Sequence, residues 1–251
     1  MRPSAKSCQR VAAAIAVAIG LSGALAPAVG ASASGYDPKI RPRNFVSTVD
    51  NPYFPLNPGD RYVYEGHTDV GDERIVVEVT DQKKTIMGVP TVVVHDKAYV
   101  NGRLEESTSD WYAQDRDGNV WYFGEATQTY DEKGKPKTTK GSWTGGVDGA
   151  KPGIQMLADP QPGKVYRQEF RRGLAEDFGK VLSVTAPATV PVGTFPETVK
   201  TKDFTPLEPK LIEHKYYAPG VGLVLEDTIR GGFGRVELVE HTSGNSTTPT
   251  T

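Results

Sequence analysis

The chain has 251 residues, a formal net charge of −2, and 37% hydrophobic against 24% charged residues. This balance is typical of a globular protein and excludes a collagen-like or largely disordered chain. The slightly negative charge provides no basic stripe, so neither nucleic acid nor an anionic membrane surface is expected as a partner.

Residues 1–33 carry the features of a secretory signal peptide. Three basic residues within the first ten precede an apolar run over residues 11–30, and an A-x-A site follows at Ala31–Ala33. Glycine and proline interrupt the run, which disfavours the alternative of a stable transmembrane anchor. The only cysteine, Cys8, lies in this segment, so the mature chain would have no disulfide and no thiolate ligand. We predict a secreted, extracellular protein that begins near Ser34.

The mature chain is predicted to form one antiparallel β domain over residues 51–241, between a flexible lead-in at 34–50 and a disordered tail at 242–251. Eleven segments rich in Val, Ile, Thr, Tyr and Phe show period-two patterning, and Gly, Pro, Asn-Gly or Asp-Gly separates most of them. They cover residues 61–68, 73–80, 91–100, 103–114, 120–130, 164–170, 176–184, 197–204, 211–218, 222–229 and 234–241. This pattern predicts an all-β fold, an antiparallel meander that forms a curved sheet or a barrel-like structure.

Residues 141–163 form a long Gly- and Pro-rich loop between these segments. Connections of this length in compact domains are uncommon and often functional. Ile154, Met156 and Leu157 could act as a lid that contacts a ligand at the mouth of a cavity. The alternative is a short turn that tucks the three side chains into the core.

Two dipeptides typical of type I′ turns, Asn101-Gly102 and Asp117-Gly118, predict the register of the central strands. With both as two-residue turns, Asp110 pairs with Glu125, and His95 lies on the same face because side chains alternate along a strand. The opposite face is the predicted core face, where Trp111 and Tyr122 would line the interior.

The predicted face with Asp110, Glu125 and His95 has three interpretations. The two carboxylates would have Cβ atoms about 5 Å apart, and His95 would lie about 7 Å from Asp110. A divalent transition metal bound by all three residues would relieve the like-charge repulsion. Proton uptake by one carboxylate would instead make the pair an acid and base. The third interpretation is a solvated polar face on which Lys97 pairs with Glu106.

A calcium loop is a poor match to the neighbouring turn. Asp115, Asp117 and Asn119 place side-chain oxygens at alternate positions, but Gly118 and the flanking strands do not fit the EF-hand pattern. Nucleotide-binding and hydrolase motifs such as the P-loop, G-x-G-x-x-G, G-x-S-x-G and H-E-x-x-H do not occur. The sequence therefore contains no established catalytic signature.

Several stretches resemble a family of secreted bacterial β-proteins. They are NPYFPLNPGDRYVYE at 51–65, DWYAQDRDGNVWYFGE at 110–125, VPVGTF at 190–195 and EHKYYAPGVGLV at 213–224. The last two are similar to stretches of DUF3108-type proteins and, more distantly, of LolA/LolB-like lipoprotein carriers. The resemblance implies a curved antiparallel sheet, LolA- or lipocalin-like, around an apolar cavity that takes lipidic ligands. The chain lacks the lipobox of the lipoprotein members, so the resemblance implies no membrane attachment here.

The leading hypothesis is a secreted, non-enzymatic, barrel-like protein that binds an apolar or amphipathic small molecule. A secreted hydrolase that uses a metal or carboxylates through His95, Asp110 and Glu125 is the second hypothesis. A surface interaction module without a pocket is the third. The sequence identifies no cofactor beyond a possible divalent metal, and it leaves the oligomeric state open.

Overall fold

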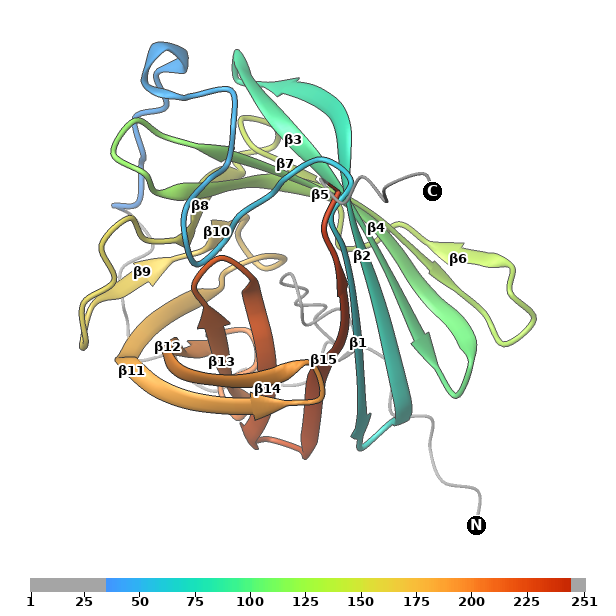
Figure 1. Cartoon of the computed structure of the whole chain (residues 1–251). Coiled ribbons are helices and arrows are strands. Elements are labelled where there is room, and N and C mark those ends of the chain that lie inside the picture. The colour runs from blue at the N-terminus through green and yellow to red at the C-terminus, as the bar shows by residue number, and fades with distance from the viewer. Residues whose placement is uncertain (1–34, 245–251) are drawn as a thin grey trace, which may run out of the picture.

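The computed structural model describes residues 35–244, which form one large, strongly curved antiparallel sheet (Figure 1). The only helix in this range is the 3-10 turn Pro42–Asn44 (η1). The all-β prediction is therefore confirmed. The predicted signal peptide and most of the predicted tail lie outside the described residues. No helix within residues 35–244 is long and apolar enough to cross a bilayer.

The strands of the first part of the chain are Arg61–Thr68 (β1), Gly71–Ile86 (β2), Val89–Val100 (β3), Arg103–Gln114 (β4), Val120–Tyr130 (β5), Pro136–Thr138 (β6), Trp143–Thr144 (β7) and Lys151–Met156 (β8). Those of the second part are Val165–Arg167 (β9), Glu169–Phe170 (β10), Phe178–Val190 (β11), Gly193–Phe204 (β12), Ile212–Ala218 (β13), Gly222–Arg230 (β14) and Gly234–Thr242 (β15). Strands β7 and β8 lie within residues 141–163, so part of the predicted loop belongs to the sheet.

The strand order is β10-β8-β5-β4-β3-β2-β1-β15-β14-β13-β12-β11-β9, with β6 and β7 paired to β5. The first and last long strands, β1 and β15, are neighbours, so the two halves of the meander join along this pair. The two ends of the order, β9 and β10, are separated in sequence only by Gln168. The sheet is not closed by a continuous ladder, but it curves until both of its ends meet in residues 165–170.

Gln168 stabilises this meeting point. Its backbone N–H donates to the Asp177 carbonyl at 2.8 Å, and its buried side-chain amide donates to Asp203 Oδ2 at 3.0 Å. Strand β8 passes so close that a Cβ atom at Gly153 would lie 2.3 Å from the Gln168 carbonyl. Glycine is therefore required at position 153 for the two ends of the sheet to approach each other.

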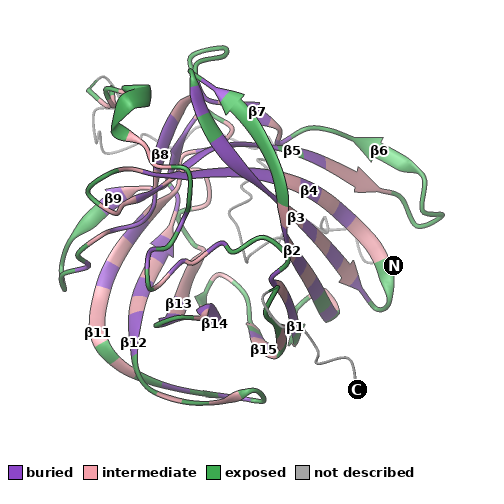
Figure 2. Ribbon diagram, turned by 45° about the horizontal axis from the view of Figure 1, so that its top comes forward, coloured by how far each residue is buried: buried purple, intermediate pink, exposed green. Residues whose placement is uncertain are grey.

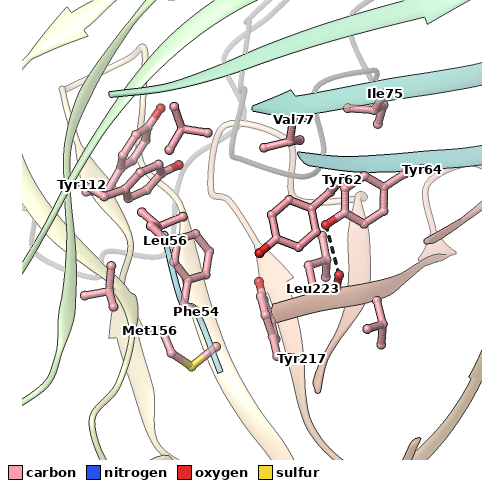
Figure 3. Packing of buried hydrophobic residues seen from close by; sticks show 14 of the residues in the cluster. Phe54, Leu56, Tyr62, Tyr64, Ile75, Val77, Tyr112, Met156, Tyr217 and Leu223 are labelled. Atoms are coloured by element: carbon pink, nitrogen blue, oxygen red, sulfur yellow. Dashed lines mark hydrogen bonds between the residues drawn. The ribbon is translucent and has the colours of Figure 1, made fainter. Parts of the chain in front are cut away.

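The main hydrophobic core lies inside the curve, as Figure 3 shows for part of it. Phe54 and Leu56, from the loop before β1, pack there against side chains of both halves of the sheet. Buried residues are frequent along β3, β4 and β5, whereas β6 and the tip of the β11–β12 hairpin are exposed (Figure 2).

A smaller core cluster lies on the outer face of β3–β5 and is covered by the N-terminal segment, residues 35–50. Phe45 packs edge-to-face on Phe123 at 5.4 Å and on Trp121 at 6.3 Å between ring centroids. Backbone hydrogen bonds attach the same segment to the β4–β5 turn, for example from Arg116 N to Asn44 O at 2.7 Å. Residues 35–50, expected as a flexible lead-in, thus contact the sheet along much of their length.

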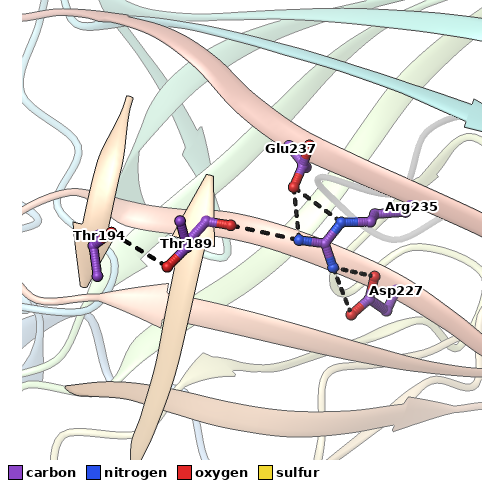
Figure 4. Close-up of polar contacts among 5 residues, drawn as sticks. All are labelled: Thr189, Thr194, Asp227, Arg235 and Glu237. Carbon is purple, nitrogen blue, oxygen red and sulfur yellow. Dashed lines mark hydrogen bonds and ion pairs between the residues drawn. The ribbon is translucent and has the colours of Figure 1, made fainter. Parts of the chain in front are cut away.

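On the outside of the second half, Arg235 of β15 connects three strands (Figure 4). Its guanidinium contacts Asp227 of β14 at 3.0 Å and Glu237 at 2.6 Å, and it donates to the Thr189 carbonyl of β11 at 3.5 Å. These groups are partly exposed, so the network contributes modestly to stability.

Candidate functional site

The two hairpins that predicted the register differ in how they turn. Asn101 and Gly102 have φ values of 50° and 76°, and Val100 pairs with Arg103, as a two-residue type I′ turn requires. Two residues further on, Ala98 pairs with Glu106, so Glu105 is an extra residue in β4. This bulge moves every later residue of β4 to the face opposite the predicted one.

The second turn has three residues instead of two. Asp115 N bonds to Asn119 O at 2.9 Å and Gly118 N to Asp115 O at 3.0 Å, which places Arg116–Gly118 in the loop. Tyr112 therefore pairs with Tyr122 rather than with Phe123. A second bulge between Trp111 and Tyr112 then restores the predicted register.

Because these two deviations cancel, Asp110 does pair with Glu125, as predicted. His95 does not share their face. It pairs with Ser109 and accepts or donates a 3.1 Å hydrogen bond with the Ser109 hydroxyl, whereas Asp110 pairs with Val94. The expectation that His95 lies beside the carboxylates is wrong because the Glu105 bulge was not visible in the turn pattern.

The three predicted metal ligands, His95, Asp110 and Glu125, therefore do not lie on one face of the sheet. Within residues 35–244 no group of three or more His, Cys, Asp or Glu side chains converges as metal ligands would. The calcium alternative also has little room, because the Asp115 carboxylate already accepts hydrogen bonds from the Asn119 backbone N–H at 2.9 Å and from the Trp121 indole at 2.7 Å. That carboxylate stabilises the turn.

Asp110 and Glu125 point to the inside of the sheet, where they are 0% and 3% exposed. The Tyr122 hydroxyl donates to Asp110 Oδ1 at 2.6 Å. The second oxygen of each carboxyl, Asp110 Oδ2 and Glu125 Oε2, is buried and has no hydrogen-bond partner among residues 35–244. A buried acceptor in this state costs free energy, so these oxygens are suited to a ligand or to a proton.

Burial raises the pKa of Asp110 well above its usual range, and the charge of Asp96 adds to the effect. The pKa of Glu125 is raised by burial and then by the charge of Asp110. The pKa of Asp96 rises to about 8, first through burial and then through the charge of Glu106. In the absence of a cation these inner-facing carboxyls therefore hold protons at neutral pH.

Tyr112 and Tyr122 are stacked inside the sheet with ring centroids 4.9 Å apart, and both are completely buried. Trp143 of β7 packs edge-on against Tyr122 at 5.3 Å. Trp111, by contrast, belongs to the outer cluster under the N-terminal segment, where Lys84 Nζ lies 3.3 Å from its ring centre. The expectation that Trp111 and Tyr122 share a face is wrong, because the three-residue turn pairs Tyr122 with Tyr112 instead.

The three apolar residues of the predicted lid are divided between strand β8 and the residue after it. Met156 and Leu157 are buried in the main core, and Ile154 is partly buried against it. Ile154 pairs with Trp121 of β5, and Met156 pairs with Val120 of the same strand. Any contact of these residues with a ligand remains a prediction.

An apolar cavity of about 40 Å³ opens beside the aromatic stack. It is lined by Phe54, Pro55, Leu56, Tyr62, Tyr64, Val77, Val221, Gly222 and Leu223. The Phe54 ring lies 5.3 Å from the Tyr112 ring, so the cavity and the Asp110–Glu125 pair are joined through Phe54, Tyr112 and Tyr122. A second hollow of about 380 Å³ lies between the N-terminal segment and the β4–β5 turn, and both charged and apolar side chains line it.

Sequence reasoning placed Asp110 and Glu125 together but missed Asp96, Phe54 and Leu56. Asp96 lies two residues after Val94 on the same face, so its burial follows once the strand's inner face is identified. The sequence signal for the cavity was the run Tyr53–Leu56, in which proline is flanked by large apolar side chains in a turn.

The chain matches no family model and no curated protein. Among solved structures it is similar to a predicted exported protein with a YmcC-like fold from Bacteroides fragilis, at 16% identity and a TM-score of 0.45, over 76% of this chain and 99% of that one. It is also similar to a predicted lipoprotein from Parabacteroides distasonis, at 13% identity and a TM-score of 0.42, with the same coverage. Function must therefore be inferred from the chain's own residues.

Proposed function

We propose that this is an exported, non-enzymatic binding protein that holds a small amphipathic molecule inside its curved sheet. The observation that carries the proposal is the apolar cavity beside Phe54. The Phe54, Tyr112 and Tyr122 rings connect this cavity to buried carboxyl oxygens that have no partner among the described residues. Binding sites for small molecules usually combine an apolar lining with a few polar groups in this way.

The number of strands supports an interior site. Thirteen strands follow one another in the sheet order, whereas side chains just fill a barrel of about eight strands. A sheet of this size leaves space that must be occupied by inserted segments or by a ligand. The inserted loop with Phe54 and Leu56 occupies part of that space.

The metal-dependent form of the hydrolase hypothesis has lost its support, because His95 lies on the opposite face from Asp110 and Glu125. The carboxylate-dependent form stays a prediction. The hypothesis of a surface module without a pocket becomes an outcome of the test below. The cavity volume of about 40 Å³ accommodates only the end of an alkyl chain, and a ring or a longer chain requires the loop with Phe54 and Leu56 to move.

Native mass spectrometry of the protein purified from its own secretions tests the proposal, because a retained ligand adds mass. As a second test, 1-hexanol should raise the melting temperature of the purified protein by mass action. Val221→Trp fills the cavity and should abolish this shift. Val192→Trp, in the exposed β11–β12 turn, is the matched control and should leave it unchanged. No added mass together with no shift from hexanol would contradict the proposal.

A further inference from the structure

The interior around Asp110 and Glu125 has an excess of acidic groups. Three further buried carboxyls lie in this region, Asp96 on β3, Glu106 on β4 and Glu169 on β10, together with the partly buried Asp177 before β11. Their charges contribute to the raised pKa values of the pair or of Tyr112 and Tyr122. No ion pair joins Asp110 or Glu125 to a lysine or arginine within the part of the chain that the structure describes. The buried Lys215 lies instead between Asp203 at 3.6 Å and Glu226 at 3.4 Å.

Tyr112 provides an independent observation. Its side chain is 0% exposed, and its hydroxyl has no hydrogen-bond partner among residues 35–244. Burial raises the pKa of Tyr112 well above its usual range, and the charges of Asp110, Glu125 and Asp96 add to this effect. A phenol hydroxyl and two carboxyl oxygens are thus buried within this part of the sheet, each without a hydrogen-bond partner among residues 35–244.

The charge of a group that would fit this space follows from its lining. A buried anion would lose its hydration with no buried cation to compensate it, and it would repel every carboxyl that ionises. A neutral hydroxyl would satisfy one oxygen and leave the acidic excess unchanged. An ammonium group can donate hydrogen bonds to both free oxygens and allows the carboxyls to ionise.

We propose that Asp110 and Glu125 bind the cationic end of an amphipathic organic amine, whose apolar part occupies the cavity beside Phe54. This inference rests on the proposed function and adds the chemical class of the ligand. The Tyr112 and Tyr122 rings lie between the two ends, since Phe54, Tyr112 and Tyr122 are in consecutive ring contact at 5.3 Å and 4.9 Å.

Binding of such a cation is coupled to proton release. The carboxyls hold protons in the free protein, and a bound ammonium stabilises their ionised forms. The affinity for the amine should therefore increase with rising pH, with roughly one proton released per ligand. A neutral alcohol of the same length should show neither effect.

The test compares hexylamine, 1-hexanol and hexanoate by isothermal titration calorimetry with the mature protein at neutral pH. Hexylamine, charged under these conditions, should bind about tenfold or more tightly than 1-hexanol, and hexanoate more weakly than either. The titration is repeated in two buffers of different ionisation enthalpy, which measures the proton release on the unmodified protein.

Two variants test whether the preference for hexylamine over 1-hexanol depends on Asp110 and Glu125. Asp110→Asn combined with Glu125→Gln keeps the shape of both side chains and should reduce the hexylamine-to-hexanol affinity ratio to about one. Asp72→Asn, at an exposed carboxylate on β2, should leave the ratio unchanged. If the double variant fails to fold, the proton release measured on the unmodified protein still tests whether the carboxyls bind the amine.

The outcomes separate the two proposals. Equal affinities for amine and alcohol, or no proton release, would overturn the cationic site while hexanol binding still supports the proposed function. Failure of all three compounds to bind would overturn both and indicate that water alone fills the space.

Discussion

At the scale of single residues, the hydrogen bond from Tyr122 to Asp110 is the contact most open to measurement. Tyr122→Phe keeps the stacked ring but removes the hydroxyl that donates to the buried Asp110 Oδ1 at 2.6 Å. We expect the free energy of unfolding to fall by about 1–3 kcal/mol in urea denaturation.

Tyr112→Phe is the matched control for this prediction. Its ring is equally buried, but its hydroxyl bonds to no group among residues 35–244, so removing it should cost less than about 1 kcal/mol. Equal losses in the two variants would show that the Tyr122–Asp110 bond does not stabilise the fold.

The buried carboxyls also predict how stability depends on pH. Burial raises the pKa of Asp96 to about 8 and that of Glu73 to about 7, whereas such groups titrate near 4 in an unfolded chain. Between these values the folded protein binds more protons, so the free energy of unfolding should fall as the pH rises from about 4 to about 8.

The Asp96→Asn variant has no titratable group at this position, so its free energy of unfolding should fall less with rising pH. Urea midpoints at about pH 5 and about pH 8.5 measure this difference. Asp72→Asn, at a carboxylate on the protein surface, is the control and should follow the parent protein. A parent protein whose stability increases over this range would show that its inner carboxyls are ionised in the folded state.

At the scale of strands, the bulge beside Gly124 depends on a residue without a side chain. Gly124 has a φ of 130°, and a Cβ atom there would lie 2.4 Å from the Trp143 carbonyl oxygen of β7. Gly124→Ala should therefore lower the free energy of unfolding by about 2 kcal/mol or more, through strain and through displacement of β7.

Gly134→Ala separates the two causes. Gly134 also has a positive φ of 72°, but a Cβ atom at this position would have no neighbouring atom within 4 Å. This substitution should cost only about 1 kcal/mol, the backbone contribution alone. If thermal denaturation shows the same loss of unfolding free energy in both variants, the contact with Trp143 does not constrain the bulge.

The other bulge of β4, at Glu105, shows which features of the strands could be predicted. Alternation identified the strand segments and placed Glu106, Asp110 and Tyr112 on one face, because period two is a local property. It could not show whether that face is inside, because both faces of β4 are covered, one by the main core and one by the N-terminal segment. The extra residue at Glu105 has no marker in the sequence, since its position depends on contacts with other strands.

At the scale of the whole molecule, the N-terminal segment is predicted to be part of the folded unit. Phe45 covers the outer cluster through edge-to-face contacts with Phe123 and Trp121. Phe45→Ala should lower the free energy of unfolding by about 2–4 kcal/mol and increase the binding of a hydrophobic dye.

Phe233→Ala serves as the comparison, because this phenylalanine is 55% exposed and its loss should change stability by less than about 1 kcal/mol. If Phe45→Ala were equally harmless, residues 35–50 would be a detachable lead-in, as the sequence suggested. The lead-in was expected because Pro and Ser indicate a solvated segment, while the few apolar residues that attach it are too widely spaced to form a pattern.

The start of the mature chain connects the export signal with this segment. The A-x-A site at Ala31–Ala33 predicts cleavage just before Ser34, and Tyr36 already donates a hydrogen bond to the Pro152 carbonyl at 2.7 Å. Cleavage there would release the whole predicted signal while keeping every described contact of the N-terminal segment.

Ala33→Phe places a large side chain where the signal requires a small one, so the precursor should accumulate, whereas Ala24→Phe in the apolar run should be processed normally. Intact mass and N-terminal sequencing of the extracellular protein measure both variants, and a secreted parent protein that retains residues 1–30 would contradict the prediction.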